Sequence, residues 1–149
     1  MTFTKVILAL ACLMSGTLLA QEAKVTPLLS KDLTNLPGKE GLMITVEYPP
    51  GNSDPIHRHN AHGFIYVLEG SIVMQVRGGK ETILTPGQSF YEGPDDVHFV
   101  GRNASQTKPA KFLVFFVKDN VASAASLLVC DGCDGSGQGA EAVPSLGRR

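Results

Sequence analysis

The sequence predicts an all-β fold, a sandwich or barrel formed by one domain of its 149 residues. Three observations support this prediction. Short segments rich in β-branched and aromatic residues recur along the chain. Gly, Pro, Asn and Asp residues bound these segments, as expected for strands that are joined by turns. No helical periodicity of useful length follows the first 20 residues, apart from a short stretch around residues 121–129.

The predicted strands lie within residues 41–119, which we expect to form the folded domain. Turn signals such as Glu69-Gly70, Gly78-Gly79 and Pro86-Gly87 separate them. In chain order, strands are expected over residues 42–48, 64–68, 71–76, 82–85, 89–91, 97–100 and 111–117.

Two of these strands carry apolar or aromatic residues on both faces. They are Phe64-Ile65-Tyr66-Val67-Leu68 and the run from Phe112 to Val117. A second sheet can cover one face of such a strand, and a partner subunit can cover the other. The sequence therefore predicts a homodimer.

Residues 1–20 have the pattern of a secretory signal peptide. Lys5 precedes an apolar run over residues 6–14, and the small residue Ala20 suits a cleavage site. This run is short for a membrane span and is interrupted by Ser15-Gly16-Thr17. We therefore predict cleavage after Ala20 and a secreted or periplasmic protein that is not attached to a membrane.

The two ends of the mature chain differ in composition from the domain between them. Residues 21–40 contain Pro27 and Pro37 and are expected to form an irregular N-terminal arm. Residues 120–149 are rich in Gly and are expected to form a flexible tail. In an oxidising compartment the tail residues Cys130 and Cys133 either form a disulfide or remain incidental thiols.

The charge of the chain excludes two classes of partner. Lys5 is the only charged residue among the first 20, so cleavage changes the formal net charge from −1 to −2. A nearly neutral chain predicts no nucleic-acid partner and no anionic membrane partner. The serines lack a G-x-S-x-G context, so no serine hydrolase site is predicted.

Three of the four histidines, His57, His59 and His62, lie within six residues. In an extended segment successive side chains point to opposite faces, so His57 and His59 share a face. Two imidazoles on one face can bind one metal ion. This cluster is the strongest functional signal in the sequence.

The segment around this cluster resembles the first motif of the cupin family, G-x5-H-x-H-x3/4-E-x6-G. Gly51, His57, His59 and Gly70 match it. The resemblance implies a double-stranded β-helix, also called a jelly-roll or cupin barrel.

A second segment resembles the second cupin motif more loosely. Gly87, His98 and Asn103 match its spacing within one residue, and Pro94 is displaced by one position. The resemblance implies that His98 joins His57 and His59 as a ligand of a divalent metal. The alternative is a metal-free cupin whose barrel holds an apolar ligand.

The first motif lacks its glutamate, which would fall at Gly63 or Phe64. Neither residue can bind a metal. By strict alternation His62 faces away from the other two histidines, but one bulged residue would turn it inward as a further ligand. Glu92 is expected to be a solvated loop acid rather than a substitute.

A site made only of histidines favours iron, copper or zinc, with nickel and manganese as the further alternatives. Two functions follow. The chain is either a dioxygenase-like metalloenzyme acting on a small organic substrate or a cupin module that binds a small ligand without converting it. Tyr66, Tyr91 and Phe99 are the candidates to line the pocket or to pack beside it. A general acid or base facing the metal would favour an enzyme, and Glu69 and Glu92 are the nearby carboxylates.

Overall fold

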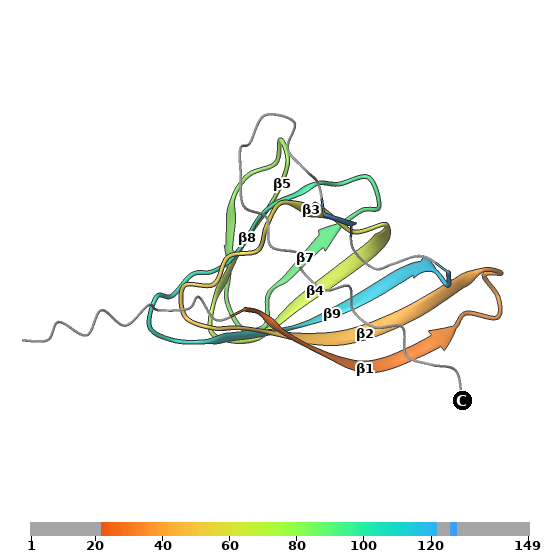
Figure 1. Cartoon of the computed structure of the whole chain (residues 1–149), viewed down its shortest axis with the longest axis horizontal. Helices are drawn as coiled ribbons and strands as arrows, with labels where there is room; N and C mark the ends of the chain where they lie inside the picture. Colours follow the sequence, from red (N-terminus) through yellow and green to blue (C-terminus); the bar gives the residue numbers. More distant parts are fainter. Residues whose placement is uncertain (1–21, 122–125, 128–149) are drawn as a thin grey trace, which may run out of the picture.

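The computed structural model describes residues 22–121 and 126–127, and over these residues the chain forms β-strands and no helix (Figure 1). Accordingly, no helix in this part of the chain is long and apolar enough to cross a membrane. The strands are β1 (Lys24–Asp32), β2 (Lys39–Tyr48), β3 (His57–Arg58), β4 (Ala61–Glu69), β5 (Ile72–Val76), β6 (Thr82–Leu84), β7 (Ser89–Glu92), β8 (His98–Asn103), β9 (Ala110–Asp119) and β10 (Ser126–Leu127).

The strands form two five-stranded antiparallel sheets. The first sheet has the order β1-β2-β9-β4-β7, and the second has the order β10-β3-β8-β5-β6. In Figure 1 strands β1, β2, β9 and β4 of the first sheet fan out side by side, and β8, β5 and β3 of the second sheet lie above them. The predicted all-β jelly-roll architecture is confirmed.

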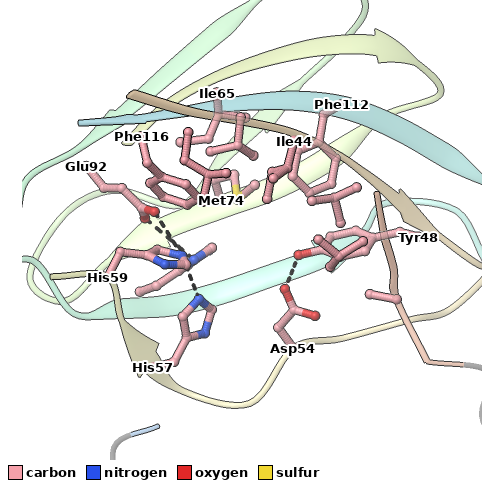
Figure 2. Close-up of a pocket in the computed structure, with 16 residues that line it drawn as sticks. Ile44, Tyr48, Asp54, His57, His59, Ile65, Met74, Glu92, Phe112 and Phe116 are labelled. Atoms are coloured by element: carbon pink, nitrogen blue, oxygen red, sulfur yellow. Dashed lines mark hydrogen bonds and ion pairs between the residues drawn. The ribbon is translucent and has the colours of Figure 1, made fainter. Parts of the chain in front are cut away.

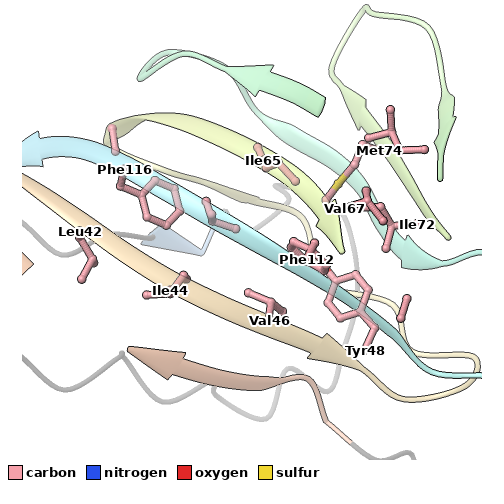
Figure 3. Packing of buried hydrophobic residues seen from close by; sticks show 14 residues of the cluster. Leu42, Ile44, Val46, Tyr48, Ile65, Val67, Ile72, Met74, Phe112 and Phe116 are labelled. Atoms are coloured by element: carbon pink, nitrogen blue, oxygen red, sulfur yellow. The ribbon is translucent and has the colours of Figure 1, made fainter. Parts of the chain in front are cut away.

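The core lies between the two sheets and follows the alternation of the strands. In β9 the residues Phe112, Val114 and Phe116 are buried, and the intervening residues are only half-buried. Figure 3 shows Phe112 and Phe116, with the labelled side chains of β2 and β4, on the same side of the first sheet as Ile72 and Met74 of β5. Each large apolar side chain buried in this way contributes roughly 1.5–3 kcal/mol relative to exposure. Alternation therefore determines which side chains reach the barrel interior.

The seven predicted strands all occur, with ends that differ by up to a few residues, but the expected irregular arm is wrong in part. Residues 24–32 form β1, which pairs with β2 along its length. The proline at position 27 is tolerated because β1 is an edge strand, and it adjoins a register shift between Pro27 and Leu29. Exposed residues such as Leu28 and Leu29 break the alternation, so the sequence pattern conceals this strand.

The residues near the C-terminal end of the described chain also differ from expectation. Within the stretch considered as a short helix, Ser126 and Leu127 form β10, which pairs with β3. The predicted signal peptide, the rest of the Gly-rich tail and both Cys130 and Cys133 lie outside the described residues.

One of the two strands predicted to be apolar on both faces, β4, has one face covered by the second sheet. Ile65 and Val67 of β4 are buried, whereas Phe64, Tyr66 and Leu68 are exposed on the outer side of the first sheet. The second sheet therefore covers the inner face, and the expected homodimer stays a prediction about the outer one.

Candidate metal centre

Three histidines meet inside the barrel from two neighbouring strands. His57 lies in β3 and pairs directly with His98 at the start of β8. His59 follows β3 by one residue, and its Nε2 atom lies 2.9 Å from Nε2 of His57. One ring nitrogen from each of the three residues lies within 4.8 Å of the others. The predicted trio is therefore brought together.

Backbone carbonyls fix the orientation of two of these rings. The Nδ1–H group of His57 donates to the carbonyl of Pro55 at 2.8 Å, and the Nε2–H group of His98 donates to that of Val100 at 2.9 Å. Each bond leaves a lone pair on the opposite nitrogen, which is the form that binds a metal. Within the described residues, the buried Nδ1 of His98 has no hydrogen-bond partner. A buried nitrogen of this kind suggests a bound ion.

Glu92 brings a carboxylate to the three histidines. One carboxylate oxygen lies 3.2 Å from Nε2 of His59, and the other lies 3.5 Å from Nδ1 of His98. The residue is only 3% exposed. The expectation of a solvated loop acid is therefore wrong. Glu92 is the last residue of β7, and strand alternation turns it inward while Tyr91 before it is half-exposed.

The position of Glu92 explains how the chain accommodates a motif without its glutamate. Gly63 of β4 pairs directly with Glu92 of β7. A Cβ atom added to Gly63 would lie 3.0 Å from Cγ of Glu92. The carboxylate that is missing from β4 is thus replaced, in the same space, by one from the neighbouring strand.

Burial and neighbouring charge shift the protonation of two groups in the cluster. Burial, together with Asp96, raises the pKa of Glu92 to about 7. Burial, together with His57 and His59, lowers the pKa of His98 to about 3. His98 is therefore neutral at neutral pH, and a bound cation would displace the proton of Glu92 into solvent.

The donor set fits a divalent transition metal. Imidazole nitrogens and carboxylate oxygens bind such ions at roughly 2.0–2.2 Å, so that neighbouring ligand atoms lie about 3 Å apart. The contacts of 2.9, 3.2 and 3.5 Å within the cluster are close to this spacing. The cluster of three histidines can therefore hold a metal, and Glu92 lies within reach of the same position.

The cluster borders a cavity of about 170 Å³ that is walled mainly by apolar side chains. His98 also lines this cavity. Figure 2 shows His57, His59 and Glu92 at one side of it, with Ile65, Met74 and Phe112 beyond them. An engineered apolar cavity of about 150 Å³ binds benzene. The space therefore suits a small organic molecule.

Two polar residues of this cavity were missed from the sequence. Tyr48, at the end of β2, donates a hydrogen bond from its hydroxyl to the carboxylate of Asp54, and both residues line the cavity. Tyr48 continues the inward alternation of Leu42, Ile44 and Val46, and this pattern could have identified it. Asp54 precedes His57 in a loop, where alternation gives no signal.

His62 lies outside the cluster. It is exposed, and its Nδ1 atom shares a hydrogen bond of 2.8 Å with the hydroxyl of Tyr91. Ala61 and Gly63 on either side are buried, so alternation is unbroken and the bulge that would turn His62 inward does not occur.

The three aromatic candidates do not line the cavity. Tyr66, Tyr91 and Phe99 are 46%, 50% and 44% exposed, respectively. Each is adjacent in its strand to an inward residue, and each therefore faces outward. Glu69, the second carboxylate considered, is exposed at the end of β4 opposite to the cluster.

Comparison with known proteins supports the same architecture. A cupin domain profile matches residues 44–116. A search of curated proteins found no match. Among solved structures, an uncharacterized Klebsiella pneumoniae protein with a double-stranded β-helix domain is similar over 71% of this chain and 84% of its own, with 19% identity and a TM-score of 0.57.

Two further solved structures resemble the chain. The TT1209 protein of Thermus thermophilus has 26% identity and a TM-score of 0.53 over 65% of this chain and 84% of its own. The DMSP lyase DddQ of Ruegeria pomeroyi has 23% identity and a TM-score of 0.53 over 62% of this chain, which spans only 45% of the lyase. At these identities the Klebsiella and Ruegeria proteins share the fold alone. Because the profile match and the two-sheet architecture coincide over the same residues, the chain belongs to the cupin family.

Proposed function

We propose that this protein is an exported cupin that holds a divalent transition metal through His57, His59 and His98 and binds a small organic molecule beside it. Glu92 is the fourth ligand. One observation carries the proposal, the convergence of four donor side chains from separate strands and loops at one side of an apolar cavity.

The carboxylate changes the expected choice of metal. The sequence prediction disfavoured manganese because a site made only of histidines lacks a hard ligand. Glu92 supplies that ligand, so the reason no longer holds. Iron, copper and zinc remain candidates, and manganese and nickel join them on equal terms.

A bound divalent ion would polarise an oxygen atom of a ligand in the cavity. The chain itself supplies the surroundings of that ligand. Apolar residues such as Ile44 and Phe112 exclude water, and the carbonyls of Pro55 and Val100 hold two of the imidazoles in place. These features serve a metalloenzyme of the dioxygenase type and a ligand-binding module equally.

Elemental analysis of the mature protein, purified without a histidine tag, tests the metal site. We expect about one transition-metal ion per chain in the wild type, loss of the ion in His98→Ala and weakened binding in Glu92→Gln. Full metal content in both variants would refute the ligand assignment. Oxygen uptake with phenols and diketones then separates the two functions, since stoichiometric metal without turnover favours the binding module.

Export is the part of the proposal that rests on the sequence alone. The basic residue and apolar run before Ala20 support it. Mass spectrometry of the protein from a secreting host should give a mature chain that begins at Gln21. A chain that retains residues 1–20 in the cytoplasmic fraction would contradict it.

A further inference from the structure

The cavity has a second polar group besides the three histidines and Glu92. Tyr48 is 1% exposed, and its hydroxyl donates to Asp54, which also lines the cavity. Figure 2 shows this pair on the opposite side of the drawn site from Glu92 and His59, with apolar side chains between them. A ligand in the cavity would therefore meet polar groups at two separated places.

The pair nevertheless lies close to the metal site. A Cβ atom added to Gly101 would lie 2.7 Å from Nε2 of His98 and 3.3 Å from the hydroxyl oxygen of Tyr48. The imidazole and the phenol thus pack against one stretch of β8 backbone. A molecule of six to eight heavy atoms, in a cavity of about 170 Å³, is long enough to reach both groups.

The pair presents acceptors rather than donors to a ligand. The single proton of the Tyr48 hydroxyl is used in the bond to Asp54. The phenolic oxygen retains a lone pair, and a carboxylate has room for more than one hydrogen bond. A partner group must therefore donate, and a second carboxylate on the ligand would be repelled by Asp54.

We propose that Tyr48 and Asp54 form a specificity subsite that selects small monocarboxylates bearing a hydroxyl or amino group at the far end from the carboxylate. This inference rests on the proposed metal site. Three neutral imidazoles and one carboxylate leave a divalent ion with a net charge of +1, which the carboxylate of the ligand would neutralise. The hydroxyl or amino group then donates to Asp54 or to the oxygen of Tyr48.

Four compounds of matched length test this subsite by calorimetry on the metal-loaded protein. Butyrate ends in a methyl group, 4-hydroxybutyrate and 4-aminobutyrate end in donors, and succinate ends in a second carboxylate. We expect the two donor compounds to bind roughly 10-fold more tightly than butyrate, the size of one or two net hydrogen bonds, and succinate to bind most weakly. The hydroxyl and amino compounds reveal which donor is preferred.

Two variants assign the selectivity to the pair. In Asp54→Asn the amide can donate, so succinate should gain and 4-aminobutyrate should lose at least 5-fold relative to butyrate. In Tyr48→Phe the preference for 4-hydroxybutyrate over butyrate should fall several-fold. Metal content should stay at the wild-type level in both variants, because neither residue is a ligand.

The outcomes separate the two proposals. A wild type without metal refutes the proposed function itself. A metal-loaded wild type that binds none of the compounds, or that shows the same ratios as a correctly folded Asp54→Asn variant, overturns the subsite alone. If Tyr48→Phe does not fold, Asp54→Asn decides the matter, since it preserves the volume of the side chain.

Discussion

Gly63 and Glu92 lie directly opposite each other on β4 and β7, and the glycine leaves the space that the glutamate side chain fills. A side chain at position 63 would have its Cβ 3.0 Å from Cγ of Glu92 and 3.2 Å from the Phe116 ring. The two positions are therefore alternatives for one carboxylate. A barrel that carries the glutamate on β7 in place of β4 therefore has the same set of metal-binding side chains.

This relationship predicts the behaviour of a swap. Gly63→Glu alone places a second carboxylate against Glu92 in a space made for one, so it should lower stability and metal affinity. Glu92→Gly alone removes the carboxylate and should weaken metal binding by roughly 10- to 100-fold. The double variant Gly63→Glu/Glu92→Gly restores one carboxylate and should recover most of the affinity in competition dialysis.

The recovery is the decisive result. If the double variant binds no better than Glu92→Gly, the two positions do not serve the same ligand site. Glu69→Gly, which changes an exposed glutamate that likewise ends a strand, serves as the control for the general effect of losing a glutamate.

The buried carboxyl of Glu92 also predicts how stability depends on pH in the metal-free protein. Burial raises the pKa of Glu92 from 4.5 to about 7, so the folded chain keeps a proton that the unfolded chain loses between these values. Stability should therefore fall as the pH rises through this window, by up to about 3 kcal/mol from this group. Urea unfolding of the metal-free wild type and of Glu92→Gln at several pH values measures the contribution of Glu92 to the free energy of unfolding.

The free energies of unfolding of wild type and Glu92→Gln must be compared at each pH, because His98 changes the stability of both proteins in the opposite direction. Its lowered pKa of about 3 makes stability rise with pH up to about 6.5. A constant stability difference between wild type and Glu92→Gln from pH 4.5 to 7 would show that Glu92 ionises in its ordinary range.

The fold and the pair His57 and His59 could be predicted because both depend on local patterns, whereas His98 was added only through the resemblance to the second cupin motif. Alternation defines the strands, and the spacing of His57 and His59 places them on one face. Glu92 was misjudged because its role depends on its pairing with Gly63, a contact between strands that are far apart in the sequence. Asp54 was missed for a similar reason, since only the folded loop carries it to Tyr48.

Asn103, which matches the end of the second motif, is predicted to stabilise the loops around the site. Its side-chain amide donates to the carbonyls of Tyr48, Pro49 and Lys108, and its oxygen accepts from the backbone of Ser105. Asn103→Asp retains the shape but loses these donors and buries a charge among carbonyls. We expect a loss of about 2–4 kcal/mol in urea unfolding, whereas the exposed control Asn35→Asp should change stability by less than about 0.5 kcal/mol. Equal effects would mean that the network is not needed.

The outer face of the first sheet predicts a dimer. Phe64 is 48% exposed, and its ring lies 5.3 Å from that of Tyr91 and 6.5 Å from that of Phe115. Phe64 and Tyr91 are exposed and Phe115 is half-buried. A cluster of aromatic rings at the surface favours a protein partner, here a second copy of the chain. Sedimentation at micromolar concentration should give twice the monomer mass, and Phe64→Glu should give a monomer.

Ile83→Glu is the control for this substitution. It changes an exposed residue of the second sheet and should leave the dimer intact. A monomeric wild type would contradict the prediction.

Gly101 is predicted to protect the geometry of His98 without being a ligand. A methyl group at this position would lie 2.7 Å from Nε2 and 2.9 Å from Cε1 of His98, and the hydroxyl of Tyr48 closes the other side at 3.3 Å. The imidazole in Gly101→Ala must therefore rotate away and lose its hydrogen bond to Val100, which orients Nδ1 toward Glu92. We expect metal affinity to fall roughly 10- to 100-fold, as when a group that orients a ligand is removed.

Gly93→Ala is the matched control. Gly93 follows Glu92 in the sequence, but a methyl group added there would meet its neighbours at ordinary distances of 3.4 and 3.5 Å. Equal metal affinities in the two variants would mean that the His98 ring has room to move, and that its bond to Val100 does not position it.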